Sequence, residues 1–145
     1  MQNQPPVQTG PAPLQNAPAK SSTGLDENLA ALLSYIATWL SGLVFFLIEK
    51  DSRLVRFHAM QAILLGAAAA VGGIVLWVLW VVVTLIFAQI ADILGTLAGL
   101  VMGLLLGVFY LAIVIAWVMC LIKSYQGQFF KLPVLGNFAE KFSTK

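Results

Sequence analysis

Few side chains near the apolar parts of this sequence could carry acid–base or nucleophilic chemistry. They are the single His58, the single Cys120 and the carboxylates Glu49, Asp51 and Asp92. One histidine and one cysteine do not make a zinc set, and one cysteine cannot form an intrachain disulfide. A proton relay or an intramembrane protease needs ionisable groups or a nucleophile–base pair inside the helices, and the apolar runs contain neither. The sequence therefore predicts a protein that is not an enzyme and has no metal site and no cofactor.

Three of these residues also allow a structural interpretation. His58 could titrate near neutral pH, but packing or capping at the membrane interface is favoured. Cys120 could be acylated, but a buried position in the apolar core is favoured. Glu49 lies beside Lys50 in the sequence, and a local surface ion pair explains it.

Two arginines, Arg53 and Arg56, lie one turn apart at the start of an expected helix. This spacing lets both reach an anionic lipid headgroup. Ordinary anchoring of the helix at the membrane surface is the other interpretation, and it is favoured. The formal net charge of the chain is +2, which is too small to imply nucleic-acid binding, so no nucleic-acid partner is expected.

The elements that must position these residues are membrane-spanning helices. The chain is 60% hydrophobic and only 10% charged, with a mean hydropathy of +0.91, and so few charges cannot cover a water-soluble surface. Three runs contain no charged residue, and each reaches the ~20 residues needed to cross a ~30 Å hydrocarbon core: 29–48, 59–91 and 93–122. We therefore predict an all-α integral membrane bundle of three transmembrane helices, at about 25–48, 53–87 and 93–123.

The boundary between the second and third expected helices contains no Pro or Gly. A continuous helix of ~60 uncharged residues would be ~90 Å long, which is too long for one crossing. Asp92 at mid-membrane would cost roughly 2.5–3.5 kcal/mol, so a turn near 88–92 places it at the interface. There we expect Asp92 to cap the third helix, and we expect Ser52 or Asp51 to cap the second.

The two ends of the chain differ from its apolar middle. Residues 1–22 hold five of the six prolines and predict a disordered Pro/Gln-rich tail, followed by a membrane domain at 23–145. Near the C-terminus, apolar residues that include Phe138 and Phe142 recur at helical spacing. They predict a short interfacial helix at about 133–143, with a loose tail as the alternative.

Four glycines at four-residue intervals make the most regular pattern in the sequence: Gly95, Gly99, Gly103 and Gly107. On a helix they form one slowly drifting stripe, and small residues let helices approach closely in lipid. Helix packing, within the chain or between copies, is the favoured interpretation. A glycine-lined pore is the alternative, and the lack of polar residues beside the stripe argues against it.

The basic residues predict an orientation in the membrane. Only Lys20 precedes the first expected helix, whereas seven basic residues follow the first or the third: Lys50, Arg53, Arg56, Lys123, Lys131, Lys141 and Lys145. Basic residues concentrate in cytoplasmic segments. We therefore expect a protein of the cell membrane with its N-terminus outside and its C-terminus in the cytoplasm.

Four stretches of the sequence carry a family resemblance. They are 29–35, Leu-Ala-Ala-Leu-Leu-Ser-Tyr, 46–50, Phe-Leu-Ile-Glu-Lys, 55–62, Val-Arg-Phe-His-Ala-Met-Gln-Ala, and 122–128, Ile-Lys-Ser-Tyr-Gln-Gly-Gln, with Lys-Leu-Pro at 131–133. Over about residues 24–141 the chain resembles a widespread family of small, uncharacterised prokaryotic multi-pass membrane proteins. More distantly, it is similar to a membrane subunit of the chloroplast inner-envelope protein-import machinery, which is described as having four spans. The resemblance implies an α-helical bundle, offers Arg56, His58 and Gln61 as functional candidates, and supplies no reaction, cofactor or substrate.

These features favour a non-enzymatic membrane protein that packs with itself or with another membrane protein, as an assembly or protein-import component does. The lipid bilayer is its other expected partner. A small transporter or channel component is the first alternative, and the absence of buried polar residues in the helices argues against it. An anionic-lipid-binding protein is the second alternative. The candidate partner- or lipid-binding residues are Arg53, Arg56, His58 and Gln61.

Overall fold

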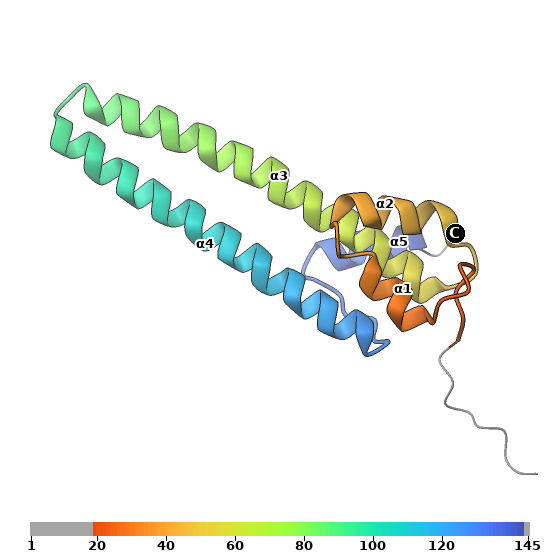
Figure 1. Ribbon diagram of the computed structural model, residues 1–145. Helices are drawn as coiled ribbons and strands as arrows, with labels where there is room; N and C mark the ends of the chain where they lie inside the picture. The colour runs from red at the N-terminus through yellow and green to blue at the C-terminus, as the bar shows by residue number, and fades with distance from the viewer. Residues whose placement is uncertain (1–18, 144–145) are drawn as a thin grey trace, which may run out of the picture.

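The computed structural model describes residues 19–143, and these form five α-helices and no strand. The helices are α1 (Glu27–Leu33), α2 (Trp39–Ile48), α3 (Arg53–Ala88), α4 (Asp92–Tyr125) and α5 (Leu135–Ser143). Helices α3 and α4 form a long antiparallel hairpin, and the three short helices surround one end of it (Figure 1). The all-α prediction is confirmed over this range, and most of the predicted tail at 1–22 lies outside the described residues.

Helices α3 and α4 lie where the sequence predicts the second and third membrane helices. The Ser52 hydroxyl caps α3 and accepts a hydrogen bond from Val55 N at 3.2 Å, as expected. At the far turn, Ala91 is the N-cap residue of α4 and Asp92 is already helical, so the predicted Asp92 cap is wrong. The carboxylate of Asp92 instead lies in the first turn of α4, where negative charge suits the helix dipole.

Both long helices have the length and apolar composition needed to cross a membrane. Few of their side chains are buried within the chain, whereas a core helix of a soluble protein is mostly buried, so lipid is a suitable cover. Helix α3 has 36 residues. It is therefore about 54 Å long, against ~30 Å for the hydrocarbon core. The hairpin can span the core and still leave one end to carry the short helices.

The prediction of a third crossing at 25–48 is wrong, because this segment is not one helix. Helix α1 has 7 residues and α2 has 10, and the chain reverses between them at 34–38. Helices of about 10 and 15 Å are too short to cross a bilayer. Thr38 has a φ of 48°, which is outside the right-handed helical region and interrupts the helix.

At the break between α1 and α2, side chains form hydrogen bonds with backbone groups that lose their helical partners there. Ser41 Oγ accepts a hydrogen bond from Ala37 N at 3.0 Å and donates to Ser34 O at 2.8 Å. Trp117 on α4 donates its Nε1 proton to Tyr35 O at 2.9 Å. Irregular backbone in apolar surroundings is stable only with such partners, and these three backbone groups have them.

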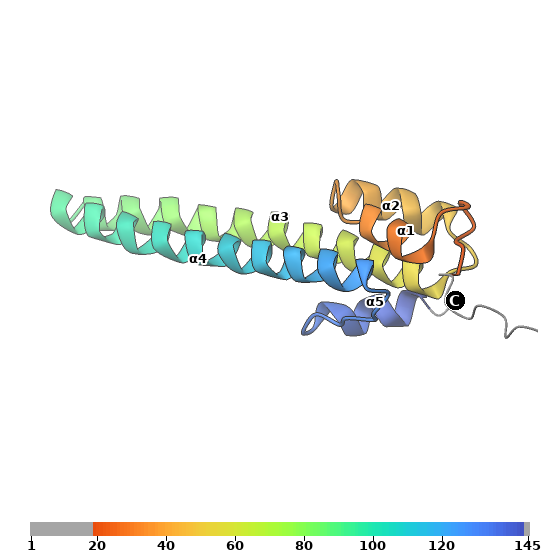
Figure 2. The same ribbon diagram turned by 60° about the horizontal axis from the view of Figure 1, so that its bottom comes forward.

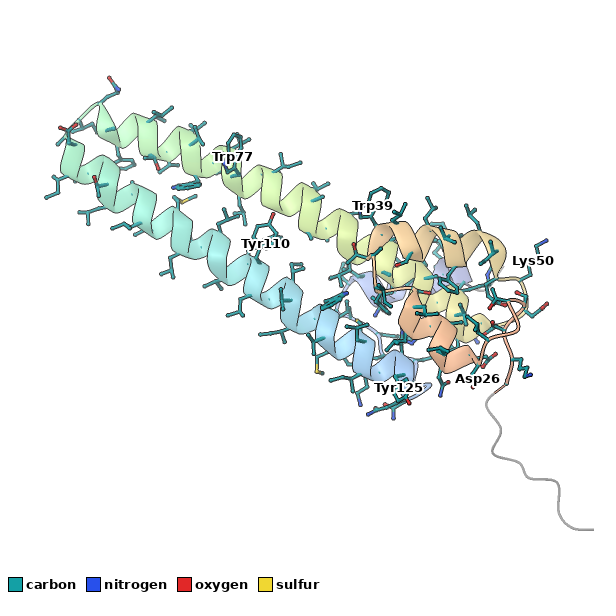
Figure 3. All side chains as sticks on the ribbon, viewed as in Figure 1. Asp26, Trp39, Lys50, Trp77, Tyr110 and Tyr125 are labelled. Atoms are coloured by element: carbon teal, nitrogen blue, oxygen red, sulfur yellow. The ribbon has the colours of Figure 1, made fainter. Side chains whose placement is uncertain are left out.

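The reversal brings the residues before α1 back to the start of α3. Ser22 N donates to the Glu49 carboxylate at 3.1 Å. Figure 3 shows Asp26, Lys50 and Tyr125 at the same end of the hairpin. Residues 20–26 and the loop at 49–52 therefore lie at one end of the molecule, whereas the prediction places them on opposite sides of the membrane. With two candidate crossings instead of three, both ends of the described chain lie at one end of the molecule.

The five-helix end of the molecule is referred to below as the base; it comprises α1, α2, α5 and the adjoining residues 53–66 and 113–125 of α3 and α4. The buried hydrophobic residues gather there. Helix α2 lies so close to α3 that a Cβ at Gly42 would be only 2.7 Å from Ala59 O. Beyond the base, α3 and α4 have only each other as neighbouring helices within residues 19–143.

Helix α5 confirms the helix predicted at about 133–143. It packs against α3, on the other side of the α3–α4 pair from α1 and α2 (Figure 2). Glu140 of α5 fixes this position through two ion pairs, with Lys131 Nζ at 2.7 Å and with Arg53 Nη2 at 3.7 Å.

Candidate functional site

Four side chains with polar or ionisable groups are buried together in the base: Tyr35, His58, Gln61 and Cys120, each 0% exposed. They are referred to below as the buried polar cluster. Tyr35 follows α1, His58 and Gln61 lie one turn apart on α3, and Cys120 is near the end of α4. A buried polar group without a hydrogen-bond partner costs about 1–3 kcal/mol. If every polar atom of the cluster has a partner within the protein, the cluster is structural; an atom without a partner would be available to a ligand or substrate.

Gln61 connects the cluster to the segment between α4 and α5. Its Nε2 donates to Phe130 O at 3.0 Å. The same nitrogen lies 3.2 Å from Cys120 Sγ and 3.3 Å from the Tyr35 hydroxyl oxygen, and these two acceptors share its second proton. Its Oε1 accepts from Leu132 N at 3.5 Å. Main-chain partners on both sides of the amide fix which way it faces, and both of its polar atoms are in use.

His58 also has partners on both ring nitrogens. Nε2 lies 2.9 Å from Gln128 O, which can only accept, so this nitrogen carries the proton. Nδ1 then accepts from the Tyr35 hydroxyl at 3.1 Å. The Phe57 ring packs edge-on at 5.2 Å between ring centres. No ring nitrogen is left for a substrate, which favours the packing interpretation of His58.

The buried polar cluster can hold the segment after α4 against α3 and α4. Its hydrogen bonds link protein atoms to one another. The Cys120 thiol is free and buried, as predicted, and its hydrogen-bonding neighbours are the Gln61 amide and the Tyr35 hydroxyl. Neither of these groups is a base that activates a thiol at neutral pH. The arrangement therefore supports a structural role for the cluster.

The structure separates the two arginines that the sequence grouped together. Arg53 is directed to the α5 side, where its Nη2 lies 3.7 Å from Glu140 Oε1. Arg56 is directed to the α2 side, where its guanidinium lies 5.0 Å from the centre of the Phe46 ring. The two side chains therefore do not converge on one site. His58 and Gln61, by contrast, are brought together with partners that the sequence did not indicate.

Glu49, between α2 and α3, is a fully buried carboxylate. It accepts hydrogen bonds from Ser22 Oγ at 2.6 Å and from the backbone N–H groups of Ser22, Asp51 and Ser52. Burial acts to raise the pKa of Glu49, but these hydrogen bonds together outweigh it, so the pKa lies below its ordinary value of 4.5. These donors, and not the neighbouring Lys50, are its partners. Glu49 thereby fastens the residues before α1 to the start of α3.

The four-glycine pattern of α4 divides into two halves. A Cβ at Gly95 would lie 2.7 Å from an atom of α3, and one at Gly99 would make ordinary contact with α3 at 3.4 Å. A Cβ at Gly103 or Gly107 would have no neighbour within 4 Å among the described residues. The first two glycines thus pack within the chain, and packing of the other two between copies stays a prediction.

Among several open grooves along the α3–α4 hairpin outside the buried polar cluster, two are lined in part by hydroxyl side chains. The larger, of about 510 Å³, is near the far turn, and its lining includes Trp80, Thr84 and Asp92. The other, of about 370 Å³, is near the start of α2, and its lining includes Trp39 and Tyr110. Figure 3 shows Tyr110 directed from α4 toward α3. Within residues 19–143, no three His, Cys, Asp or Glu side chains gather as a metal site, and we assign none.

Replacing Gln61 with leucine removes every hydrogen bond of its amide at similar volume. We expect Gln61→Leu to lower the free energy of unfolding by about 1–3 kcal/mol, because Phe130 O and Leu132 N lose a buried partner. Unfolding in mixed detergent micelles, followed by circular dichroism, measures this quantity. Gln89→Leu, at an exposed position of the far turn, is the matched control and should change it little. Equal effects of the two substitutions on the free energy of unfolding would contradict this structural role of Gln61.

Glu49 makes the attachment of residues 20–26 depend on pH. Because its folded-state pKa is below 4.5, its stabilisation is fully present above pH 4.5 and is lost as the pH falls through the lower, folded-state value. We expect the amide proton resonances of Ser22, Asp51 and Ser52 to shift together in an NMR titration, with a midpoint below 4.5. Glu49→Gln should remove this shared transition. A midpoint at or above 4.5 would show that the carboxylate is not held as described.

Residues 25–139 match the family described as the magnetosome magnetite crystal formation protein family. The chain is 39% identical over 125 residues to UPF0132 membrane protein MJ1443 of Methanocaldococcus jannaschii, across 86% of this chain and 94% of that protein. It is 32% identical to UPF0132 membrane protein MJ1527 of the same organism, across 82% and 71%. A UPF0132 membrane protein of Archaeoglobus fulgidus is 35% identical, across 81% and 95%. No solved structure matches the chain.

These relatives are named as membrane proteins, which supports α3 and α4 as membrane spans. The matched region includes α1 to α4 and the buried polar cluster. The predicted membership of a family of small prokaryotic membrane proteins is confirmed, whereas the more distant resemblance to the chloroplast import subunit stays a prediction. The chain belongs to the magnetosome magnetite crystal formation (MamF/MmsF) family, and its archaeal relatives are named UPF0132 membrane proteins.

Proposed function

We propose that this protein is a non-enzymatic membrane component that assembles through α4 with a second membrane protein, either another copy of itself or a different chain. The observation that carries the proposal is the open surface at Gly103 and Gly107, referred to below as the open glycine pair. It lies beyond the base, where the hairpin consists of two helices only. Such a small-residue surface suits the close approach of another helix in lipid.

The other helical glycines of the hairpin and of α2 support this proposal by contrast. Gly42 and Gly66 lie against the neighbouring helix in the base, and Gly72 and Gly73 lie against aromatic side chains of α4. A Cβ at any of these four positions would come within 3 Å of another atom. Nothing in residues 19–143 approaches the open glycine pair in this way. A helix from outside the chain would give the pair the contact that the other glycines already have.

The family description names the formation of magnetite crystals in magnetosomes. For this chain we take from it only a role in a membrane-bound assembly, because the buried polar cluster is fully engaged in holding the fold. A protein-import role is a narrower form of the same proposal. It rests on the distant resemblance to the chloroplast subunit alone, and two candidate crossings differ from the four spans described for that subunit.

Transport is the weaker alternative. The runs 59–91 and 93–122 contain no charged residue, so the hairpin offers an ion no charged group along most of its length. Ion and proton pathways through membrane proteins are normally marked by such groups. Assembly therefore fits the two long helices better than transport does.

We further infer that the base faces the cytoplasm and that both ends of the described chain lie on that side of the cell membrane. Every basic residue in residues 19–143 belongs to the base or to the segments beside it: Lys20, Lys50, Arg53, Arg56, Lys123, Lys131 and Lys141. The far turn at 89–91 contains none. This distribution supports a cytoplasmic base by the positive-inside rule, now with two crossings.

Cysteine labelling tests this orientation. We expect Lys20→Cys and Lys50→Cys to react with a membrane-impermeant maleimide only after the cells are permeabilised, and Ile90→Cys to react in intact cells. Cys120 can stay, because it is buried. Labelling of position 20 from outside, with position 50 protected, would restore the three-crossing arrangement and refute this one.

The assembly proposal predicts that bulk at the open glycine pair blocks contact with the partner. A photo-crosslinking residue in place of the exposed Leu104 should capture a membrane protein of discrete mass in cells, identified by mass spectrometry. Combining Gly103→Leu with Gly107→Leu should abolish this product without lowering the amount of folded protein, because neither position has a close neighbour in the part of the chain that the structure describes.

Ala112→Leu is the matched control for this experiment. It adds a similar side chain at an exposed position of the same helix, on a different face, so the crosslinked product should persist. Capture of lipid alone, or a product that survives the double glycine substitution, would refute assembly through this surface.

A further inference from the structure

The two arginines at the start of α3 differ in how their charge is balanced. Arg53 lies 3.7 Å from Glu140, and Glu140 also binds Lys131 at 2.7 Å. The Arg53 guanidinium also lies 5.7 Å from the centre of the Phe129 ring. Arg53 therefore has an acidic partner and an aromatic partner within the chain.

Arg56 has no acidic partner among the described residues. Its guanidinium lies over the Phe46 ring, and Nη1 donates to Glu49 O at 3.2 Å. Its Nε is buried without a hydrogen-bond partner. A half-buried cation without a counter-charge is costly, and an anion bound to the terminal nitrogens of the guanidinium would offset that cost.

An apolar groove of about 240 Å³ lies further along the same face of α3. Its lining residues are Trp39, Ile63, Gly66, Ala67 and Ala70. Ile63, Ala67 and Ala70 follow Arg56 by seven, eleven and fourteen residues, a spacing that keeps them on one face of the helix. At 1.5 Å per residue, the groove begins about 10 Å beyond Arg56, in the direction of the membrane-spanning part of α3.

We propose that Arg56 and this groove bind one anionic phospholipid, with its phosphate at Arg56 and one hydrocarbon chain in the groove. A guanidinium matches a phosphate in charge and in its paired donors. A lipid whose headgroup lies at the basic end of the hairpin extends its chains along α3 into the bilayer, which is the direction from Arg56 to Ala70. The sequence allowed both arginines to share a headgroup; the geometry assigns this role to Arg56 alone. This proposal does not depend on assembly through the open glycine pair.

Native mass spectrometry of the full chain, released from micelles with added lipid, tests the site. We expect phosphatidylglycerol to be retained and phosphatidylcholine to be lost. Arg56→Gln should weaken phosphatidylglycerol binding about tenfold, the effect of losing one charge-assisted contact. Arg53→Gln removes the same charge one turn away and is the matched control; because Arg53 is already paired with Glu140, binding should change little.

A second variant keeps the proposal testable if Arg56→Gln fails to fold. Ala67→Leu fills the groove from an exposed position and leaves Arg56 unchanged, and it should also weaken phosphatidylglycerol binding. Inorganic phosphate should not displace the lipid. Equal losses in Arg53→Gln and Arg56→Gln would overturn the proposal in favour of general surface attraction. Equal retention of phosphatidylcholine would overturn it, and so would displacement by inorganic phosphate, which would indicate a site for the free ion.

Discussion

The base depends on hydrogen bonds that give partners to irregular backbone in apolar surroundings. Ser41 and Trp117 bind the backbone at the break between α1 and α2. Gln61 and His58 bind the segment that follows α4. Each of these two segments reverses the chain, and buried backbone groups at a reversal are stable only where they have hydrogen-bond partners. The positions of α1, α2 and α5 on the hairpin, and hence both arginine environments, follow from these few contacts.

Helix lengths could be predicted from the sequence where the run of apolar residues was much longer than a single crossing. Helices α3 and α4 begin and end within two residues of the predicted positions, because polar residues bound them on both sides. The same criterion failed at 25–48, since hydropathy does not show where backbone groups find partners. Serines such as Ser34 and Ser41 are the local signal of the break, but they also occur on packed, unbroken membrane helices. This one error placed Lys20 on the opposite side of the membrane from Lys50, because the number of crossings decides which face a terminus reaches.

The candidate site was predictable in its residues but not in its geometry. The family resemblance indicated His58 and Gln61, yet their partners are the main-chain oxygens of Gln128 and Phe130, about 70 residues away, which no side-chain pattern marks. The burial of Glu49 was missed for the same reason, because its partners are mostly backbone N–H groups. The two arginines have identical side chains and adjacent positions, so only their tertiary neighbours distinguish them.

The short turn between α3 and α4 bears on the biogenesis of the protein. If the base faces the cytoplasm, as we propose, the part of the chain that must be carried through the bilayer is the region around 89–91, and Asp92 is the charged residue beside it. The free-energy barrier to insertion then includes the transfer of a single carboxylate, which costs roughly 2.5–3.5 kcal/mol on insertion scales. Two apolar helices that partition together as a helical hairpin require no export of a polar domain. Hydrophobic partitioning of this pair supplies the driving force for membrane integration.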